Sequence, residues 1–233
     1  MAAARNSAEP LTTPSAQTLD RGLRALEILA QETGGLSAND LATRLGVHRT
    51  ISYRILGTLA EHHLVTRTAE GRFRLGAGIL ALSRNFAAQL QAAAMPELAN
   101  LAEDLGATAC LSVADGSEAV VVLSIEPRHT HIHVSYRTGF RHPLAVGASG
   151  IAILAGRPAE AQEREAITAA RKLGYALTRD EIERGACGLA APLLIAGRPA
   201  EASIGVVALG EIEVEKAAPR VREAAKAIEA ALV

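Results

Sequence analysis

The stretch GVHRTISYRILGTLAEHHLV, residues 46–65, has the pattern of one amphipathic helix with a polar first half. Steps of about 100° per residue place an apolar stripe on one side, formed by Ile51, Ile55, Leu56 and Leu59. The opposite side carries basic, hydroxyl and aromatic groups, with one serine beside the apolar stripe: Arg49, Thr50, Tyr53 and Arg54, and Ser52. Such groups at the start of a helix, turned away from its core, favour a binding partner outside the core.

The two segments before this stretch predict two more helices. In residues 18–35, TLDRGLRALEILAQETGG, leucines at spacings of three and four mark one buried stripe, and two glycines end it: Leu19, Leu23, Leu26 and Leu29, then Gly34 and Gly35. In residues 36–47, LSANDLATRLGV, Ser37 is a candidate N-cap, with Asp40 three residues later and Gly46 at the end. A helix, a short turn and a second helix form the helix-turn-helix arrangement, and residues 46–65 supply its second helix.

The segment after this stretch predicts a two-stranded hairpin, or wing. In residues 64–76, LVTRTAEGRFRLG, two alternating runs flank the turn AEG. Phe73 is expected to pack back on the helices. Arg67 and Arg72 on the hairpin suit contacts with phosphates or with a minor groove.

These residue types suit the edges of DNA bases. Arginine can bond guanine with two hydrogen bonds, hydroxyls can reach a base or a phosphate, and a ring can touch a thymine methyl group. The start of the second helix usually makes such contacts. We therefore predict that residues 17–76 are a winged helix-turn-helix domain that binds double-stranded DNA through Arg49, Thr50, Ser52, Tyr53, Arg54, Arg67 and Arg72. The alternative is a three-helix module that binds protein and leaves its arginines in solvent.

The net charge of the chain is small, so the positions of its basic residues matter more than their number. The whole chain has a net charge of −1, and residues 17–76 contain eight arginines and six acidic residues. Such a small excess is no polybasic arm, so nucleic-acid binding would depend on where the arginines lie.

The rest of the chain predicts an α+β organisation. Residues 1–16 have one arginine and no apolar segment, which indicates a disordered tail and no secretory signal. Residues 77–94, AGILALSRNFAAQLQAAA, predict a linker helix that ends at Met95–Pro96. The remaining domain, 95–233, combines helix and strand patterns: helices at 96–106 and 215–232, a hairpin of 107–115 with 118–126, and strands at 131–137 and 197–210. We expect a mixed or antiparallel sheet flanked by helices.

Composition excludes some classes of protein. No run of about 18 apolar residues exists, so we expect no membrane span. Cys110 and Cys187 fit no metal-binding spacing and favour a reducing cytoplasm. We expect no cofactor.

From about Thr18 to its C-terminus the chain resembles the IclR family of bacterial transcriptional regulators. The resemblance lies in LDRGLRALEIL, LSANDLATRLGVHRTISYRILGTLAEHHLV and GRFRLG, and later in TGFRHPLAVGASGIAILAG (138–156) and GYALTRDEIERGACGLAAPLL (174–194). It implies a regulator that binds a near-palindromic operator as a homodimer or a dimer of dimers. It also implies that residues 95–233 form a GAF-like domain that holds a small-molecule effector.

The resemblance places an effector site at seven positions: Gly147, Ala148, Ser149, Thr178, Gly188, Gly205 and Val207. A loop here leads into a helix whose free N–H groups can hold an anion or a carbonyl. Alternatively, small residues here simply let the helix pack tightly on the sheet.

The chain departs from the family pattern where the family usually carries hydroxyl, thiol, acidic or lysine side chains, at Gly147, Ile151, Thr178, Gly188, Gly205 and Val207. Fewer polar partners favour an effector larger or more apolar than a two- or three-carbon keto acid. The alternative is a domain that binds nothing and serves only assembly.

A histidine run offers a rival function. In RHTHIHVSYR, residues 128–137, a strand would place His129, His131 and His133 on one face, where they could hold zinc with an open fourth position. The face could equally be solvated or sensitive to pH. An enzyme with an appended winged helix is therefore the alternative function. No companion carboxylate or thiol spacing, Gly-x-Ser-x-Gly or phosphate loop supports it, so we predict no metal, no catalytic residue and no enzyme.

Overall fold

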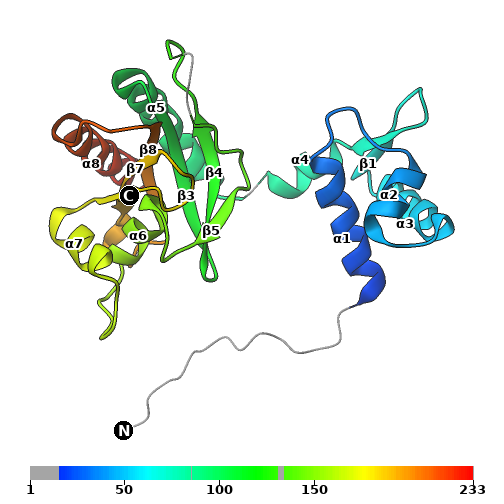
Figure 1. The fold of residues 1–233 in the computed structure, drawn as a ribbon, viewed down its shortest axis with the longest axis horizontal. Coiled ribbons are helices and arrows are strands. Elements are labelled where there is room, and N and C mark those ends of the chain that lie inside the picture. The colour runs from blue at the N-terminus through cyan, green and yellow to red at the C-terminus, as the bar shows by residue number, and fades with distance from the viewer. Residues whose placement is uncertain (1–15, 85, 131–133, 233) are drawn as a thin grey trace, which may run out of the picture. The chain divides into compact units, whose positions relative to one another are not determined.

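The computed structural model describes residues 16–84, 86–130 and 134–232. These residues form two compact units that divide between Phe86 and Ala87 (Figure 1). Apart from Ala16, the expected N-terminal tail lies outside the described residues. Within the described ranges, no helix combines the length and the apolar character that crossing a membrane requires.

The first unit contains the predicted three helices and hairpin, followed by a short helix. Its elements are α1 (Gln17–Ala30), α2 (Ala38–Leu45), α3 (Arg49–Glu61), β1 (Val65–Arg67), β2 (Phe73–Leu75) and α4 (Gly78–Ser83). The strands β1 and β2 pair antiparallel. The helix-turn-helix and its wing are thereby confirmed.

Helix α2 begins and ends with the residues that its sequence predicts. The Ser37 side chain accepts a hydrogen bond from the Asp40 amide at 3.2 Å, and the Asp40 carboxylate accepts one from the Ser37 amide at 3.4 Å. This reciprocal capping box fixes the start of α2. Gly46 ends α2 with a φ of 65°, a left-handed conformation that glycine adopts without steric cost.

One apolar cluster holds the first unit together. It joins α1, α2, α3 and the hairpin through eleven buried residues: Ala25, Leu29, Leu36, Ala38, Leu41, Leu45, Ile55, Leu56, Leu59, Val65 and Phe73. Phe73 packs on the helices as expected. The buried stripe expected on α1 was wrong at its first half, because Leu19 and Leu23 are 63% and 53% exposed.

The second unit is a six-stranded antiparallel sheet between two pairs of helices. Its elements are α5 (Ala88–Leu105), β3 (Thr108–Asp115), β4 (Glu118–Ile125), β5 (Arg141–Pro143), α6 (Ala148–Ala155), α7 (Glu165–Leu173), β6 (Ala176–Arg179), β7 (Ala186–Leu193), β8 (Ala202–Leu209) and α8 (Val214–Ala231). The strand order is β5-β4-β3-β8-β7-β6, with every neighbouring pair antiparallel. The predicted α+β fold class is confirmed.

The two faces of this sheet serve different purposes. Helices α5 and α8 cover one face, and α6 and α7 lie on the other (Figure 1). Side chains alternate along a strand, so Leu111 and Ile204 enter the main core beneath α5 and α8. Cys110 and Ser112 on β3 and Gly205 on β8 therefore face the side of α6.

Two sequence predictions in this region were wrong. The linker helix expected over 77–94 is interrupted, because α4 ends at Ser83 and α5 begins at Ala88 after a left-handed Ala87. Helix α5 then continues through Pro96, since buried Ala94 and Leu98 pack on the sheet on both sides of the proline. The strand expected over 131–137 is not formed by its described part, residues 134–137.

Candidate functional site

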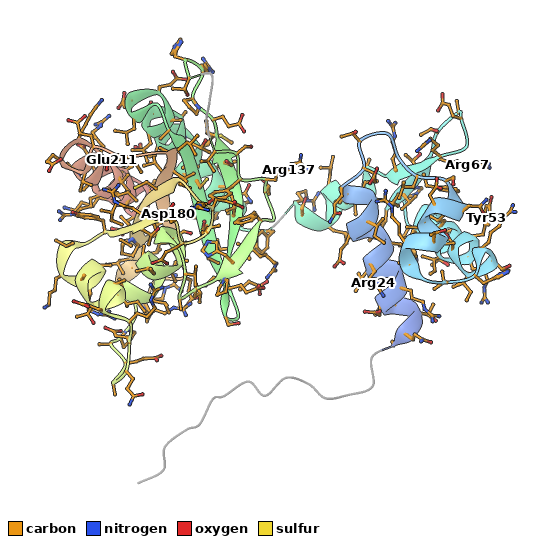
Figure 2. All side chains as sticks on the ribbon, in the orientation of Figure 1. Arg24, Tyr53, Arg67, Arg137, Asp180 and Glu211 are labelled. Atoms are coloured by element: carbon orange, nitrogen blue, oxygen red, sulfur yellow. The ribbon has the colours of Figure 1, made fainter. Side chains whose placement is uncertain are left out.

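The start of α3 presents a group of exposed polar side chains. The His48 side chain accepts a hydrogen bond from the Thr50 amide at 3.4 Å and so caps the helix. Arg49, Thr50, Tyr53 and Arg54 are all exposed. Figure 2 shows Tyr53 projecting outward from α3. The structure thus brings four of the five predicted α3 residues to one accessible end of the helix.

Arg49 and Tyr53 are one helical turn apart and contact each other. The Arg49 guanidinium lies over the Tyr53 ring, 5.3 Å from its centroid. A cation over an aromatic face is attracted by the quadrupole of the ring, by roughly 0.5–1 kcal/mol when exposed. This contact limits the conformations of the long Arg49 side chain before a partner binds.

Ser52 corrects the prediction for α3. Its side chain is completely buried, and its hydroxyl donates a hydrogen bond to the Ala38 carbonyl oxygen at 2.9 Å. Because Ser52 lies beside the apolar stripe of α3, its side chain faces α2, and its hydrogen bond connects the two helices. Ser52 is therefore a structural residue and offers no group to a ligand outside.

We predict that Ser52→Ala lowers the free energy of unfolding by about 1 kcal/mol, because one buried hydrogen bond is lost. Chemical denaturation of the full chain measures this change. Thr50→Ala is the matched control, since Thr50 is exposed and its hydroxyl lies 3.2 Å from the exposed His48 side chain. A Thr50→Ala protein less stable than Ser52→Ala would contradict the assignment.

The wing arginines have unequal freedom. Arg67 is exposed, and its guanidinium lies 5.8 Å from the centroid of the Phe73 ring. Arg72 uses two guanidinium nitrogens to donate to the Gly35 carbonyl oxygen, at 3.0 and 2.9 Å. Arg72 therefore fixes the wing to the loop before α2, a role that the sequence did not indicate.

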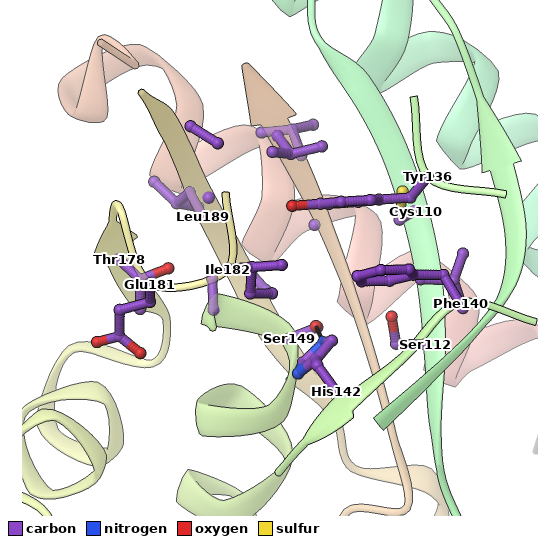
Figure 3. Close-up of a pocket in the computed structure, with 18 residues that line it drawn as sticks. Cys110, Ser112, Tyr136, Phe140, His142, Ser149, Thr178, Glu181, Ile182 and Leu189 are labelled. Carbon is purple, nitrogen blue, oxygen red and sulfur yellow. Dashed lines mark hydrogen bonds between the residues drawn. The ribbon is translucent and has the colours of Figure 1, made fainter. Parts of the chain in front are cut away.

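The second unit contains a partly open pocket between the sheet and the start of α6. Its volume is about 50 Å³, enough for a few water-sized groups. Its walls come from β3, β7 and β8, from α6 and from two loops: Cys110, Ser112, Val121, Tyr136, Phe140, His142, Ala148, Ser149, Thr178, Glu181, Ile182, Ala186, Gly188, Leu189, Ala190, Gly205, Val206 and Val207. Figure 3 shows Tyr136 and Phe140 on one side and Thr178 and Glu181 on the other, with Ile182 between them.

Six of the seven positions expected for an effector line this pocket: Ala148, Ser149, Thr178, Gly188, Gly205 and Val207. The seventh, Gly147, does not line it but ends the loop that enters α6. The two glycines on the strands leave no room for larger residues. A Cβ atom at Gly205 would lie 2.4 Å from the Leu189 carbonyl oxygen, and one at Gly188 would lie 3.2 Å from the Ala148 Cβ. Close strand packing therefore excludes a side chain at Gly205, and the contact with α6 makes one at Gly188 tight.

Several lining residues were missed by sequence reasoning: Cys110, Ser112, Tyr136, Phe140, His142, Glu181 and Ile182. Alternation along the predicted strand 107–115 places Cys110 and Ser112 on one face, and this was the available signal. The two rings, Tyr136 and Phe140, stack with centroids 4.7 Å apart and planes 10° apart. They lie on a loop, where no periodicity indicates a direction.

Several polar groups of the pocket are hydrogen-bonded or stay protonated. His142 is buried, with Nδ1 3.1 Å from the Pro143 carbonyl oxygen and Nε2 2.9 Å from the Ser149 hydroxyl. A carbonyl only accepts, so Nδ1 carries a proton and donates to Pro143. Burial raises the pKa of Cys110 to about 11 and that of Tyr136 to about 12, so both stay protonated at neutral pH.

Ser112 is the exception among these groups. Its side chain is buried, and no group in the described ranges hydrogen-bonds its hydroxyl. The residue lies at a shift in the register between β3 and β4. Buried hydroxyls are nearly always hydrogen-bonded, so this one can serve a bound molecule.

The Glu181 carboxylate lies at the N-terminal end of α6, against the Gly147 amide. Its carboxylate accepts a hydrogen bond from the Gly147 amide at 2.9 Å and pairs with the Arg164 guanidinium at 2.9 and 3.2 Å. These donors, Arg164 first, lower the pKa of Glu181, although partial burial opposes them. The pocket therefore has an ionised carboxylate at its edge, and that carboxylate is already paired.

The predicted histidine face is described only in part. His131 and His133 lie outside the described residues, and His129 is exposed, with Nε2 3.5 Å from Glu103. In the described part of the chain, no three His, Cys, Asp or Glu side chains are grouped so that they could hold a metal ion.

Comparison with known proteins identifies both units. Residues 18–69 match the IclR helix-turn-helix domain, and residues 86–167 match the bacterial transcriptional regulator IclR C-terminal domain. The chain is 34% identical over 187 residues to the HTH-type transcriptional regulator Rv1719 of Mycobacterium tuberculosis, covering 76% of this chain and 72% of the relative. It is 30% identical over 213 residues to the glycerol operon regulatory protein of Streptomyces griseus, covering 82% and 84%.

A solved structure confirms the fold. An IclR homolog from Microbacterium hydrocarbonoxydans, complexed with 4-hydroxybenzoate, superposes with a TM-score of 0.79 at 23% identity and covers 92% of this chain and 98% of that one. The rival interpretation as an enzyme is excluded, because both matched domains are those of a regulator. The chain belongs to the IclR family of bacterial transcriptional regulators and binds DNA through its helix-turn-helix.

Proposed function

We propose that α3 reads an operator with Arg49, Thr50, Tyr53 and Arg54, and that Arg67 on the wing contacts the DNA backbone. The observation that carries this proposal is the exposed cluster at the first two turns of α3, the second helix of a helix-turn-helix. The first turns of such a helix meet base edges in the major groove. Arg72 serves this surface indirectly, by holding the wing in place.

The same protein responds to a small molecule. The pocket beside α6 supports this role, because its lining includes an unpaired hydroxyl and six of the positions expected for an effector. The relative from Microbacterium hydrocarbonoxydans, which holds 4-hydroxybenzoate, supports it further. An effector changes operator affinity only if it binds one arrangement of the protein more tightly than another. Because the free volume is about 50 Å³, a larger effector must either extend out of the open side of the pocket or displace lining side chains.

The regulator acts in the cytoplasm as a homodimer or a dimer of dimers on a near-palindromic operator. Two-fold operators match the symmetry of dimers. Exposed leucines on α1 and α4 support contact with a second copy, since Leu80 and Leu82 are 71% and 73% exposed. Gel filtration and light scattering test this state, and a strictly monomeric protein on and off DNA would overturn it.

Selection of bound genomic duplexes by the purified protein tests the function. We expect enrichment of a near-palindromic motif at near-physiological salt, and a further change in its occupancy when small molecules are added. No enrichment in either condition would contradict the proposed reading surface.

A further inference from the structure

The described pocket lining offers an anion no lysine or arginine side chain. Of the 18 described residues that line it, none is lysine or arginine, and the sole carboxylate is Glu181. Thiol and phenol groups stay protonated there, as the raised pKa values of Cys110 and Tyr136 indicate. A second carboxylate, brought by a ligand, would enter beside Glu181 without a cation in the lining to balance it.

The groups that would hold a ligand carboxylate are already occupied. Arg164, the nearby cation, donates to Glu181 from Nη1 and Nη2, and its Nη1 also donates to the Ala145 carbonyl oxygen. The Gly147 amide at the start of α6 also donates to Glu181. The protein thus places a carboxylate of its own at the end of the helix, where an anion is favoured.

The groups that remain suit an uncharged ligand. The buried Ser112 hydroxyl has no partner among the described residues and can donate or accept. Ala148 and Ser149 line the pocket at the first turn of α6, where amides have no partner within the helix, so they can bond a carbonyl. The stacked rings of Tyr136 and Phe140 form one side of the pocket, and the Tyr136 hydroxyl points inward (Figure 3).

We propose that the pocket selects small uncharged molecules, with an amide, carbonyl or hydroxyl group on an apolar body, over carboxylates. Glu181, held by Arg164 and Gly147, enforces this choice. The inference rests on the proposed function, because it assumes that the pocket binds the effector.

Calorimetric titration of the full chain with matched probes tests the selectivity. The chain contains no tryptophan, which favours heat as the signal. The pairs are acetamide with acetate and 4-hydroxybenzamide with 4-hydroxybenzoate, which differ within each pair mainly in charge. At neutral pH both acids are ionised, and we expect the amide of at least one pair to bind at least about 10-fold more tightly than its acid.

Glu181→Ala should reverse the preference. It frees the Gly147 amide and the Arg164 guanidinium and removes the repelling charge, so carboxylate affinity should rise at least about 10-fold. Glu181→Gln is the second variant, which loses the charge but keeps an acceptor for the Gly147 amide. We expect it to bind carboxylates with intermediate affinity. Circular dichroism of each variant checks that it is folded.

The outcomes separate the two proposals. Equal or tighter binding of the acids by the unmodified protein would overturn the selectivity but leave the pocket as an effector site. Unchanged carboxylate affinity in folded Glu181→Ala and Glu181→Gln would also overturn it. If neither pair binds any of the three proteins, the pocket is not a ligand site, and both proposals fail.

Discussion

Replacing Arg49 by alanine should lower the affinity for the selected operator about 10- to 100-fold, while affinity for unrelated duplex falls far less. A well-placed arginine on a guanine edge contributes roughly 1–3 kcal/mol of discrimination. The side chain is exposed at the first residue of α3 and is restrained over the Tyr53 ring. A dimer would lose this contact in both half-sites, so the upper part of the range is expected.

Tyr53→Ala should reproduce part of the loss, because it removes the ring over which Arg49 lies. Titration of labelled operator and scrambled duplex at two salt concentrations measures both affinities. Arg24→Ala is the matched control, since it removes the same charge from an exposed position on α1, away from Tyr53 (Figure 2). Equal losses of operator and scrambled affinity in Arg49→Ala would mean that α3 is not the reader.

Local patterns predicted the first unit well because its determinants are close in sequence. The capping box joins residues three apart, and Gly46 ends α2 at the place where its pattern stops. Ser52 shows the limit of this reasoning. A residue beside an apolar stripe can face either solvent or a neighbouring helix. Ser52 faces a helix, because its hydrogen-bond acceptor is the carbonyl of Ala38, 14 residues earlier in the chain.

The pocket depended on contacts that no local pattern contains. Glu181 meets the Gly147 amide across 34 residues, and the acidic cluster of the sequence gives no sign of it. The pocket residues on β7 and β8 could be predicted from the resemblance to a family. The rings of Tyr136 and Phe140 could not, because they lie on an irregular loop. Pro96 shows the same principle in the core, because burial on both sides of it holds α5 together despite the lost hydrogen bond.

The second large effect is expected at Gly147. Its φ of 77° and ψ of 155° lie in a region that is essentially restricted to glycine, and other residues pay about 1–3 kcal/mol there. A Cβ atom would also lie 2.4 Å from Ile182 Cδ1 and 3.4 Å from His142 Cε1. Gly147→Ala should therefore lower the free energy of unfolding of the second unit by about 3 kcal/mol, the sum of strain and overpacking.

Two comparisons divide that loss into its causes. Gly116→Ala is the control for backbone strain, because Gly116 has a φ of 62° and a Cβ atom there would meet nothing within 4 Å. Gly147→Ala combined with Ile182→Ala removes the steric contact, so the double variant should lose less than the two single changes add up to. Denaturant unfolding measures all four proteins. A Gly147→Ala protein that loses no more stability than Gly116→Ala would show that Ile182 yields freely and that Gly147 does not set the shape of the pocket edge.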